Sequence, residues 1–269
     1  LFDNDEIMSF LPLCHIFEQL FTILSHFDVG HVVNFIESMD TITDNMVEIS
    51  PTVGHAVPRI WEKYYSTIMI RMADATWFKR LAFNTALKIG QKRASMTMNF
   101  KPVPPLLELQ YKLSHFFVFR KLKKRLGFER MRVAYSGAAP IAPEILHFFH
   151  SIGMELMEGY GQTEGTGVTT TATAGEVKFG TVRTPLGGVE IKIADDGEIL
   201  VKSPGVFKGY FKNPESTAET IVDGWLQSGD VGTIDADGYL SITDRKKDII
   251  VTAGGKNITP QFIENKLKS

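Results

Sequence analysis

The stretch from residue 131 to residue 161 constrains the fold more than any other part of the chain. MRVAYSG (131–137) is an apolar run that stops at a glycine, and PIAPEILHFFHSIG (140–153) has helical spacing. MELMEGYG (154–161) is a second apolar run that ends in a glycine-bearing loop. A strand–helix–strand unit of this kind predicts a parallel sheet with helices on its faces. The expected fold class is therefore α/β, with a parallel sheet flanked by helices.

Two loops follow the strands of this unit, YSGAAP (135–140) and EGYGQTEG (158–165). Open α/β sheets bind ligands beyond the carboxyl ends of their strands. Because the two loops lie one strand–helix–strand unit apart, they are candidates for the two walls of one slot.

Apolar spacing predicts further elements ahead of this unit. IMSFLPLCHIF (7–17) fits a buried strand that runs into a helix start. The other expected elements are helical spacing over 16–27, strands at VVNFI (32–36) and MVEIS (46–50), a helix beginning near Pro58, a proline-rich loop at 99–109 and a helical stretch ending at Gly127.

The pattern changes after about residue 175. VEIKIADDGEILVKS and TIDADGYLSIT each place an Asp-Gly pair between alternating runs, which is a strong hairpin signal. The expected organisation is an α/β subdomain over 1–174 with a helical insert at about 58–127, followed by a small β-rich subdomain over 175–245. Residues 246–269 form the remaining segment.

Composition narrows the class of protein. The formal net charge is −2, which gives no reason to expect a nucleic-acid partner. The single cysteine, Cys14, excludes an internal disulfide framework and a cysteine-based metal cluster, so a reducing cytoplasm is the expected compartment. No apolar run approaches the roughly 18–20 residues needed to span a bilayer. The acidic start, without an initiator methionine, predicts a piece of a longer protein.

The window EGYGQTEGTG (158–167) has no aliphatic side chain and is the richest candidate site. Its glycines allow a ligand to approach the backbone, its threonines suit phosphate oxygens, and a glutamate offers a hard oxygen ligand for magnesium. A dinucleotide loop is excluded, because Gly159, Gly161 and Gly165 do not fit G-x-G-x-x-G. A polar surface turn and a nucleotide site both remain open on composition.

Three other segments carry weaker signals. YSGAAP is a common kind of turn, Gly-Asp-Val-Gly (229–232) fits an aspartate that caps its own hairpin, and DRKKD (244–248) fits a solvated charge run. Acidic, basic and glycine residues recur within residues 226–260, which supports a diol-binding or phosphate-binding site only modestly.

Taken in order, LPLCHIFE, YSGAAP, EGYGQTEG, SGD and DRKKDII with a following GGK resemble the motifs of the adenylate-forming superfamily, whose members bind AMP. PTVGHAVPRIWEKYYSTI and the helical insert after it resemble the long-chain fatty acid–CoA ligases in particular. The resemblance covers nearly the whole chain. It implies a ligase that forms carbon–sulfur bonds, with ATP, Mg²⁺ and coenzyme A as cosubstrates and a long-chain fatty acid as substrate.

The resemblance also assigns roles to individual residues. Tyr160 stacks on adenine, Thr163 bonds the α-phosphate, Glu164 ligates magnesium, and Asp230 holds the ribose hydroxyls with Arg245 beside it. The full set assigned to the nucleotide is Ser136, Gly137, Ala138, Glu158, Gly159, Tyr160, Gly161, Gln162, Thr163, Asp230 and Arg245.

Two further residues complete the implied catalytic set with Thr163 and Glu164. His15 is placed near the carboxylate and the acyl entrance, although a lone histidine at the end of an apolar strand also fits a satisfied core residue. Lys247 aligns with the hinge at which a small C-terminal domain swings, and VTAGGKNITP (251–260) resembles the strand that lines the coenzyme A path.

Some expected parts of the family pattern do not occur in these 269 residues. The lysine-bearing phosphate loop is absent, TTTATAG (169–175) is no substitute for it, and most of the C-terminal domain is missing. We therefore expect a fragment that is inactive alone. An adenylating enzyme with another acid or acceptor, such as an acyl-carrier-protein or aryl ligase, and a non-catalytic nucleotide-binding relative remain the alternatives.

The segment YKLSHFFVFRKLKKRLGFERMR (111–132) interleaves basic with apolar residues. Apolar residues at 113, 116, 117, 119, 122 and 126 approximate one helical face. The favoured interpretation is a surface helix that packs this stripe on the core and solvates its basic side. The alternative is peripheral contact with anionic lipid, in which Lys121, Lys123 and Lys124 take part.

Overall fold

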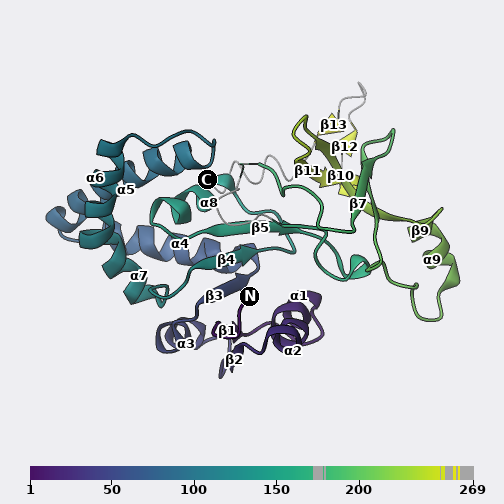
Figure 1. The fold of residues 1–269 in the computed structure, drawn as a ribbon, viewed down its shortest axis with the longest axis horizontal. Helices are drawn as coiled ribbons and strands as arrows, with labels where there is room; N and C mark the ends of the chain where they lie inside the picture. The colour runs from purple at the N-terminus through teal and green to yellow at the C-terminus, as the bar shows by residue number, and fades with distance from the viewer. Residues whose placement is uncertain (172–177, 179, 249, 252–256, 259, 261–269) are drawn as a thin grey trace. The chain divides into compact units, whose positions relative to one another are not determined.

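The computed structural model describes residues 1–171, 178, 180–248, 250–251, 257–258 and 260 (Figure 1). The contacts between Cα atoms divide the chain into two compact units. Among the described residues, the first unit comprises Leu1–Met157, and the second comprises residues 158–171, 178, 180–248, 250–251, 257–258 and 260. Each unit is described by itself.

Parallel strand pairs form the centre of the first unit. β1 (Glu6–Ser9) pairs with β2 (Val32–Phe35), and β3 (Val53–Ala56) pairs with β4 (Val133–Ser136). β3 and β4 belong to a four-stranded sheet with the order β3-β4-β5-β6. In this sheet β5 (Leu156–Tyr160) begins in the first unit and ends in the second, and β6 (Thr170–Thr171) belongs to the second. The predicted α/β class is confirmed, and the strands expected at 32–36, 131–137 and 154–161 are present.

The segment expected as a strand at 46–50 is helical, so that prediction is wrong. Helix α3 runs from Ile42 to Ile49, and its two buried side chains, Ile42 and Met46, are four residues apart. This spacing is the helical one, and it becomes visible only when MVEIS is taken together with the ITDN before it. Ser50 ends the helix in the left-handed conformation, at φ 48°.

Helices cover the strands of the first unit. Near β1 and β2 the chain forms a continuous helical segment, which comprises α1 (Ile16–Glu18), the π-helix η1 (Gln19–Leu24) and α2 (Ser25–Val29). The helical insert and the helix of the strand–helix–strand unit are α4 (Pro58–Ala73), α5 (Trp77–Thr97), α6 (Pro105–Ser114), the π-helix η2 (His115–Phe119), α7 (Arg120–Leu126) and α8 (Pro143–Ser151). Figure 1 shows the insert gathered beside α8, away from α1 and α2.

The helical insert is closely packed. Pro58 begins α4 as predicted, and Trp61, Tyr64 and Ile68 lie buried on one face at helical spacing. Helix α5 approaches α8 so closely that a Cβ at Gly90 would lie 2.2 Å from the carbonyl oxygen of Ser151. Within the described residues no helix combines the length and apolar character needed to cross a bilayer.

Antiparallel strands dominate the second unit. Both predicted hairpins are present, because β7 pairs with β8 and β10 pairs with β11. The sheet order is β11-β10-β8-β7, and Leu226, Ile199 and Leu240 fill its core. The elements of this unit are η3 (Thr163–Gly165), β7 (Glu190–Ile193), β8 (Glu198–Lys202), α9 (Pro214–Thr220), β9 (Ile221–Val222), β10 (Trp225–Ile234), β11 (Leu240–Arg245), η4 (Lys246–Asp248), β12 (Ile250–Val251) and β13 (Asn257–Ile258).

Candidate functional site

The loop after β5 is a tight turn that requires glycine. The carbonyl of Gln162 accepts hydrogen bonds from the N–H groups of Gly165 and Gly167, both at 3.0 Å. A Cβ at Gly161 would lie only 1.9 Å from the carbonyl oxygen of Gly167, so no side chain fits there. The glycines therefore let the loop fold back on itself immediately after Tyr160.

Tyr160 and Asp230 form the buried centre of the second unit's candidate site. Tyr160 ends β5, and its hydroxyl donates a 2.8 Å hydrogen bond to Oδ2 of Asp230 in β10. Both side chains are buried. The hydroxyl of Ser228 accepts from the Asp230 N–H at 3.1 Å, which fixes the backbone at the same point.

Arg245 completes this group from the neighbouring strand. Asp230 and Arg245 are directly opposite each other in the antiparallel register of β10 and β11. The guanidinium Nε lies 2.9 Å from Oδ1 of Asp230. The structure thus brings together three residues that the sequence expected at one site, Tyr160, Asp230 and Arg245.

Burial governs the protonation of this group. It raises the pKa of Asp230 above its ordinary value, although the hydrogen bond from Tyr160 and the charge of Arg245 oppose the shift. Burial, followed by the negative charge of Asp230, raises the pKa of Tyr160 far above its ordinary value. The Tyr160 hydroxyl therefore stays protonated and acts as a donor.

An irregularity in β10 positions Asp230. The register of β10 against β8 shifts between Gln227 and Val231, and Gly229 between them has φ +71°. Glu198 of β8 accepts the Gly229 N–H at 2.8 Å through Oε1 and contacts Lys246 Nζ at 2.7 Å through Oε2. This carboxylate thereby fastens the strand irregularity to the residue before Lys247.

The phosphate and metal candidates lie on the loop itself. Thr163 is exposed, and Glu164 is half-buried. Oε1 of Glu164 accepts a 2.8 Å hydrogen bond from the hydroxyl of Tyr210, and the Glu164 carbonyl accepts from the Phe207 N–H at 2.8 Å. Gln162 is half-buried beside them. The 203–213 segment therefore holds the glutamate in place.

The YSGAAP loop belongs to the first unit and follows β4. Ser136 is fully buried, and within the described residues its hydroxyl has no hydrogen-bond partner. Ala138 has φ +68°, the left-handed conformation that non-glycine residues rarely adopt. Gly137 between them is buried. A buried, unpaired hydroxyl beside a strained turn is a feature that a polar ligand would satisfy.

His15 has a structural task in the first unit. It is the N-cap of α1, and its Nδ1 accepts a 3.2 Å hydrogen bond from the Phe17 N–H. The ring is half-buried, so it remains reachable. Capping and ligand contact are compatible, because the other ring nitrogen is not used by the cap.

The remaining expected residues have the following places. Glu158 and Gly159 lie within β5, where Gly159 is opposite Thr171 of β6. Lys247 lies exposed in η4. Of the coenzyme A segment at 251–260, residues 252–256 and 259 lie outside the described residues.

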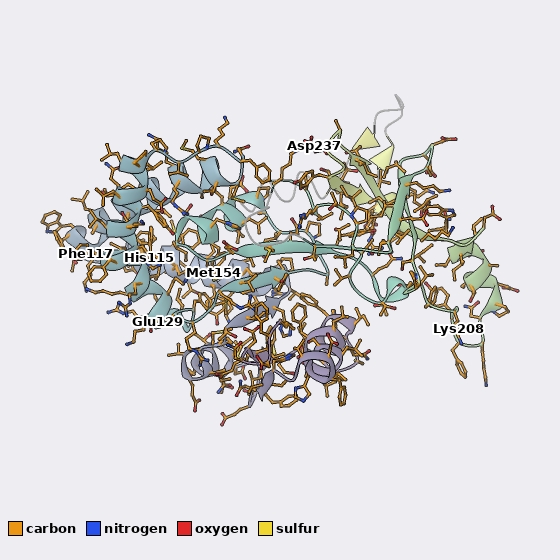
Figure 2. All side chains as sticks on the ribbon, in the orientation of Figure 1. His115, Phe117, Glu129, Met154, Lys208 and Asp237 are labelled. Carbon is orange, nitrogen blue, oxygen red and sulfur yellow. The ribbon has the colours of Figure 1, made fainter. Side chains whose placement is uncertain are left out.

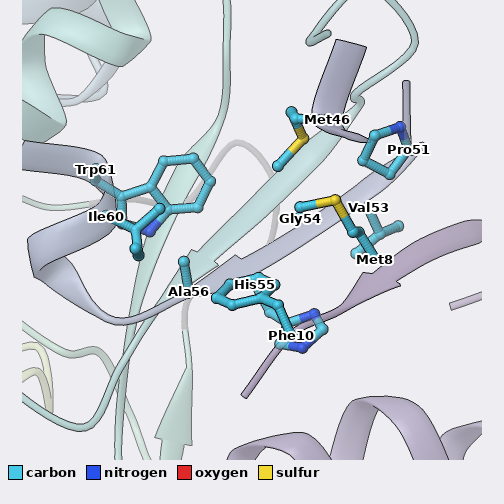
Figure 3. Close-up of a pocket in the computed structure, with 10 residues that line it drawn as sticks. All are labelled: Met8, Phe10, Met46, Pro51, Val53, Gly54, His55, Ala56, Ile60 and Trp61. Atoms are coloured by element: carbon cyan, nitrogen blue, oxygen red, sulfur yellow. The ribbon is translucent and has the colours of Figure 1, made fainter. Parts of the chain in front are cut away.

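The first unit also contains an apolar pocket, shown in Figure 3. His55 is its titratable side chain and stacks on Phe10, with ring centroids 5.8 Å apart. Behind the pocket wall, Nε2 of His55 lies 3.2 Å from Oε2 of the buried Glu18. The lining residues are Met8, Phe10, Met46, Pro51, Val53, Gly54, His55, Ala56, Ile60 and Trp61.

Sequence reasoning missed three side chains that support the site: Tyr210, Glu198 and Ser228. Tyr210 and Glu198 act on partners distant in sequence, Glu164 and Gly229, so local pattern gave little sign of them. Ser228 bonds the Asp230 N–H only two residues away, but a serine at this spacing is common in turns. Glu198 carried one signal, because it is an acid in a strand (EILVK) whose first four residues are all buried.

A family model described as "AMP-binding enzyme" matches residues 1–211. The chain belongs to this family. fadD11 of Mycobacterium tuberculosis is 41% identical over 264 residues, which cover 97% of this chain and 46% of the relative. FadD15 of the same organism, named a long-chain-fatty-acid–CoA ligase, is 36% identical over 99% of this chain and 44% of its own length. The chain thus spans less than half the length of these relatives.

Solved structures show the same fold. An anthranilate CoA ligase in complex with anthranoyl-AMP superposes with a TM-score of 0.70 at 19% identity, covering 99% of this chain and 44% of the other. ATP-bound MatB from Rhodopseudomonas palustris superposes with a TM-score of 0.68 at 24% identity, covering 100% and 45%. At these identities the likeness establishes the fold of adenylate-forming enzymes.

Proposed function

We propose that this AMP-binding family chain forms part of a ligase that activates a long-chain fatty acid with ATP and transfers the acyl group to coenzyme A. The observation that carries the proposal is the buried Asp230 carboxylate, held by Tyr160 on one oxygen and Arg245 on the other. The names of relatives such as FadD15 support the acid and the acceptor.

Asp230 is suited to bind a ribose diol. Each carboxylate oxygen has two lone pairs, so the bonds to Tyr160 and Arg245 leave acceptor capacity on both. Arg245 is half-exposed and offers its remaining N–H donors to the ligand. We assign the face of Tyr160 to the adenine, beside the backbone of Glu158 and Gly159.

Glu164 fits a magnesium ligand of the kind that binds with a nucleotide. Mg²⁺ usually takes one or two carboxylates together with substrate phosphates and water. The Tyr210 hydrogen bond orients Glu164 and leaves it further acceptor capacity. Bound magnesium would offset phosphate charge.

The proposed chemistry has two steps. The acid's carboxylate oxygen forms a bond to the α-phosphorus of ATP and pyrophosphate leaves; then the thiol of coenzyme A bonds to the acyl carbon and AMP leaves. In the second unit, Thr163 donates to the α-phosphate in the first step. In the first unit, Ser136 has an unpaired hydroxyl that can donate to a polar ligand, and His15 is the residue that the resemblance assigns to the acid.

The test of the nucleotide site is Asp230→Asn in the longest natural chain that carries this sequence. We expect AMP affinity, measured by calorimetry, to fall about 10- to 100-fold, because hydrogen bonds to charged groups contribute about 1.5–3 kcal/mol. Asp237→Asn is the matched control, since Asp237 lies exposed in a hairpin turn (Figure 2). Equal affinity for the Asp230 variant and the wild type would overturn the assignment.

The acid is identified by pyrophosphate release from that same full chain. We expect palmitate and oleate to support release, and benzoate and malonate to support little. Preference for an aryl or short acid would favour the alternative adenylating ligase, and binding of ATP without release by any acid would favour a non-catalytic relative. The 269 residues alone should release none, because they contain no lysine-bearing phosphate loop before His15.

A further inference from the structure

The helix formed by α6 and η2 carries a continuous apolar stripe on its outside. Five side chains are each more than half exposed and are called here the outer face: Leu106 (67%), Leu109 (56%), Leu113 (52%), Phe116 (59%) and Phe117 (61%). Their spacing places them along one side of a helix. Figure 2 shows Phe117 at the outer edge of the helical insert.

The opposite side of the same helix is already docked. Leu107, Tyr111 and Phe119 are buried against the insert. Arg93 of α5 ties the helix down, because its Nε lies 2.7 Å from Oε2 of Glu108 and its guanidinium carbon lies 4.3 Å from the centre of the Tyr111 ring. The helix is therefore already packed on its own unit through its opposite side, and the outer face stays exposed. The expectation that the whole stripe packs on the core is wrong for Leu113, Phe116 and Phe117.

Basic residues continue the outer face at its C-terminal end. Residues 105–126 contain six basic side chains and one acid, Glu108, which is paired with Arg93. Arg120, Lys121 and Lys124 are exposed, and the Nε of Arg120 lies 3.5 Å from Oε1 of Glu129, just beyond this stretch. Lys123 is different: it is buried and donates a 2.9 Å hydrogen bond to the Gly153 carbonyl, so it is a structural residue.

We propose that the outer face docks on an anionic lipid bilayer, with its leucine and phenylalanine side chains in the interface and Arg120, Lys121 and Lys124 against the headgroups. A helix that joins exposed aromatic and leucine side chains to a cluster of cations has the composition of interfacial membrane helices. Contiguous exposed apolar surface on a soluble protein marks an interaction site. The excess of positive charge favours an anionic surface over a neutral one. The outer face projects outward from the insert and is therefore accessible to such a surface.

The first measurement is co-sedimentation of the full chain with vesicles. One set contains phosphatidylcholine alone, and the other contains an equal mixture of phosphatidylcholine and phosphatidylglycerol. We expect binding to the anionic set that weakens as salt is added, because headgroup attraction is screened. Neither acid nor nucleotide is needed, so this result is independent of the proposed function.

The second measurement separates the two parts of the surface. Phe116→Ser with Phe117→Ser should lower the partition coefficient at least roughly tenfold on anionic vesicles. Phe27→Ser with Phe35→Ser is the matched control, since both rings are exposed elsewhere in the first unit, and it should change nothing. Lys121→Gln with Lys124→Gln should lower anionic binding about fivefold per lysine and leave phosphatidylcholine binding unchanged. Lys63→Gln with Lys208→Gln is the control for charge.

Several outcomes would overturn the proposal. One is equal vesicle binding by the Phe116/Phe117 variant and the wild type, with thermal unfolding confirming that both are folded. Another is no binding of the full chain to either vesicle set. A third is a dimer in sedimentation velocity that the same variant dissociates, because the outer face would then be covered by a second copy.

Discussion

At the scale of single residues, the Glu18–His55 pair is the most heavily buried ionisable contact of the first unit, and both side chains are fully buried. Oε1 of Glu18 accepts from the Thr22 hydroxyl at 2.5 Å, and Oε2 accepts from the Leu11 N–H at 3.1 Å. His55 also stacks on Phe21, with ring centroids 4.6 Å apart. The pair thus holds helix α1, which His15 caps, against β3.

The charge of Glu18 makes a prediction about acid stability. Burial raises the pKa of Glu18, but the hydrogen bond and charge of His55, with hydrogen bonds from Ser9 and Thr22, outweigh burial and lower the pKa to about 2. Since the pKa of Glu18 in the folded protein lies below its ordinary value of 4.5, its contribution to stability is present above pH 4.5 and is lost as the pH falls towards 2. Its size is on the order of 3 kcal/mol.

We expect Glu18→Gln to destabilise the protein at neutral pH by about 1–3 kcal/mol, because a buried imidazole loses its charged partner. Urea unfolding at pH 7 and near pH 3 measures this. The wild type should lose more stability on acidification than the variant does. Glu48→Gln, at an exposed site on α3, should leave the wild-type pH dependence intact. Identical acid sensitivity in the Glu18 variant would contradict the assignment.

At the scale of elements, local sequence signals predicted correctly the turns and helix ends that are formed by residues close together in the sequence. Both Asp-Gly hairpins formed as expected, because their turns need no distant partner. Pro58 and Gly127 bounded the helical insert for the same reason. The short MVEIS run failed, because five residues cannot distinguish helical from strand spacing. The exposure of Phe116 and Phe117 also could not be predicted, since periodicity shows a stripe but not what covers it.

The turn after β5 makes a prediction at this scale. Gly161→Ala should destabilise the protein by more than about 1 kcal/mol, because its Cβ would overlap the carbonyl of Gly167, a backbone atom that cannot rotate away. AMP affinity should fall with it. Gly187→Ala is the matched control, since nothing lies within 4 Å of its added Cβ. Chemical unfolding of both variants measures the difference, and equal midpoints would refute the steric argument.

At the scale of the molecule, the resemblance grouped residues that the structure brings together, but it did not give their contacts. Tyr160, Asp230 and Arg245 were expected in one site, and in the structure Tyr160 and Arg245 both contact the Asp230 carboxylate. Their partners Tyr210 and Glu198 were not expected, because side-chain pairs between distant segments leave no local pattern.

The division into two units predicts independence between distant changes. Glu18 lies in the first unit and Gly161 in the second. The double variant Glu18→Gln with Gly161→Ala should therefore lose the sum of the two single losses, to within about 0.5 kcal/mol. Urea unfolding of the four proteins measures this. A coupling well beyond that margin would show that the two units respond as one.

The clamp on Lys246 has a mechanical consequence. Its ammonium lies 2.6 Å from Asp196 and 2.7 Å from Glu198, and both carboxylates belong to the β7–β8 hairpin region. If Lys247 is the pivot that the resemblance implies, the residue before it is anchored, and rotation can begin only beyond that anchor. β10 and β11 would then stay fixed while the following segment turns. In the proposed reaction, Asp230 and Arg245 would then keep their contacts with the ribose in both steps, so the intermediate would not need to be released and bound again between them.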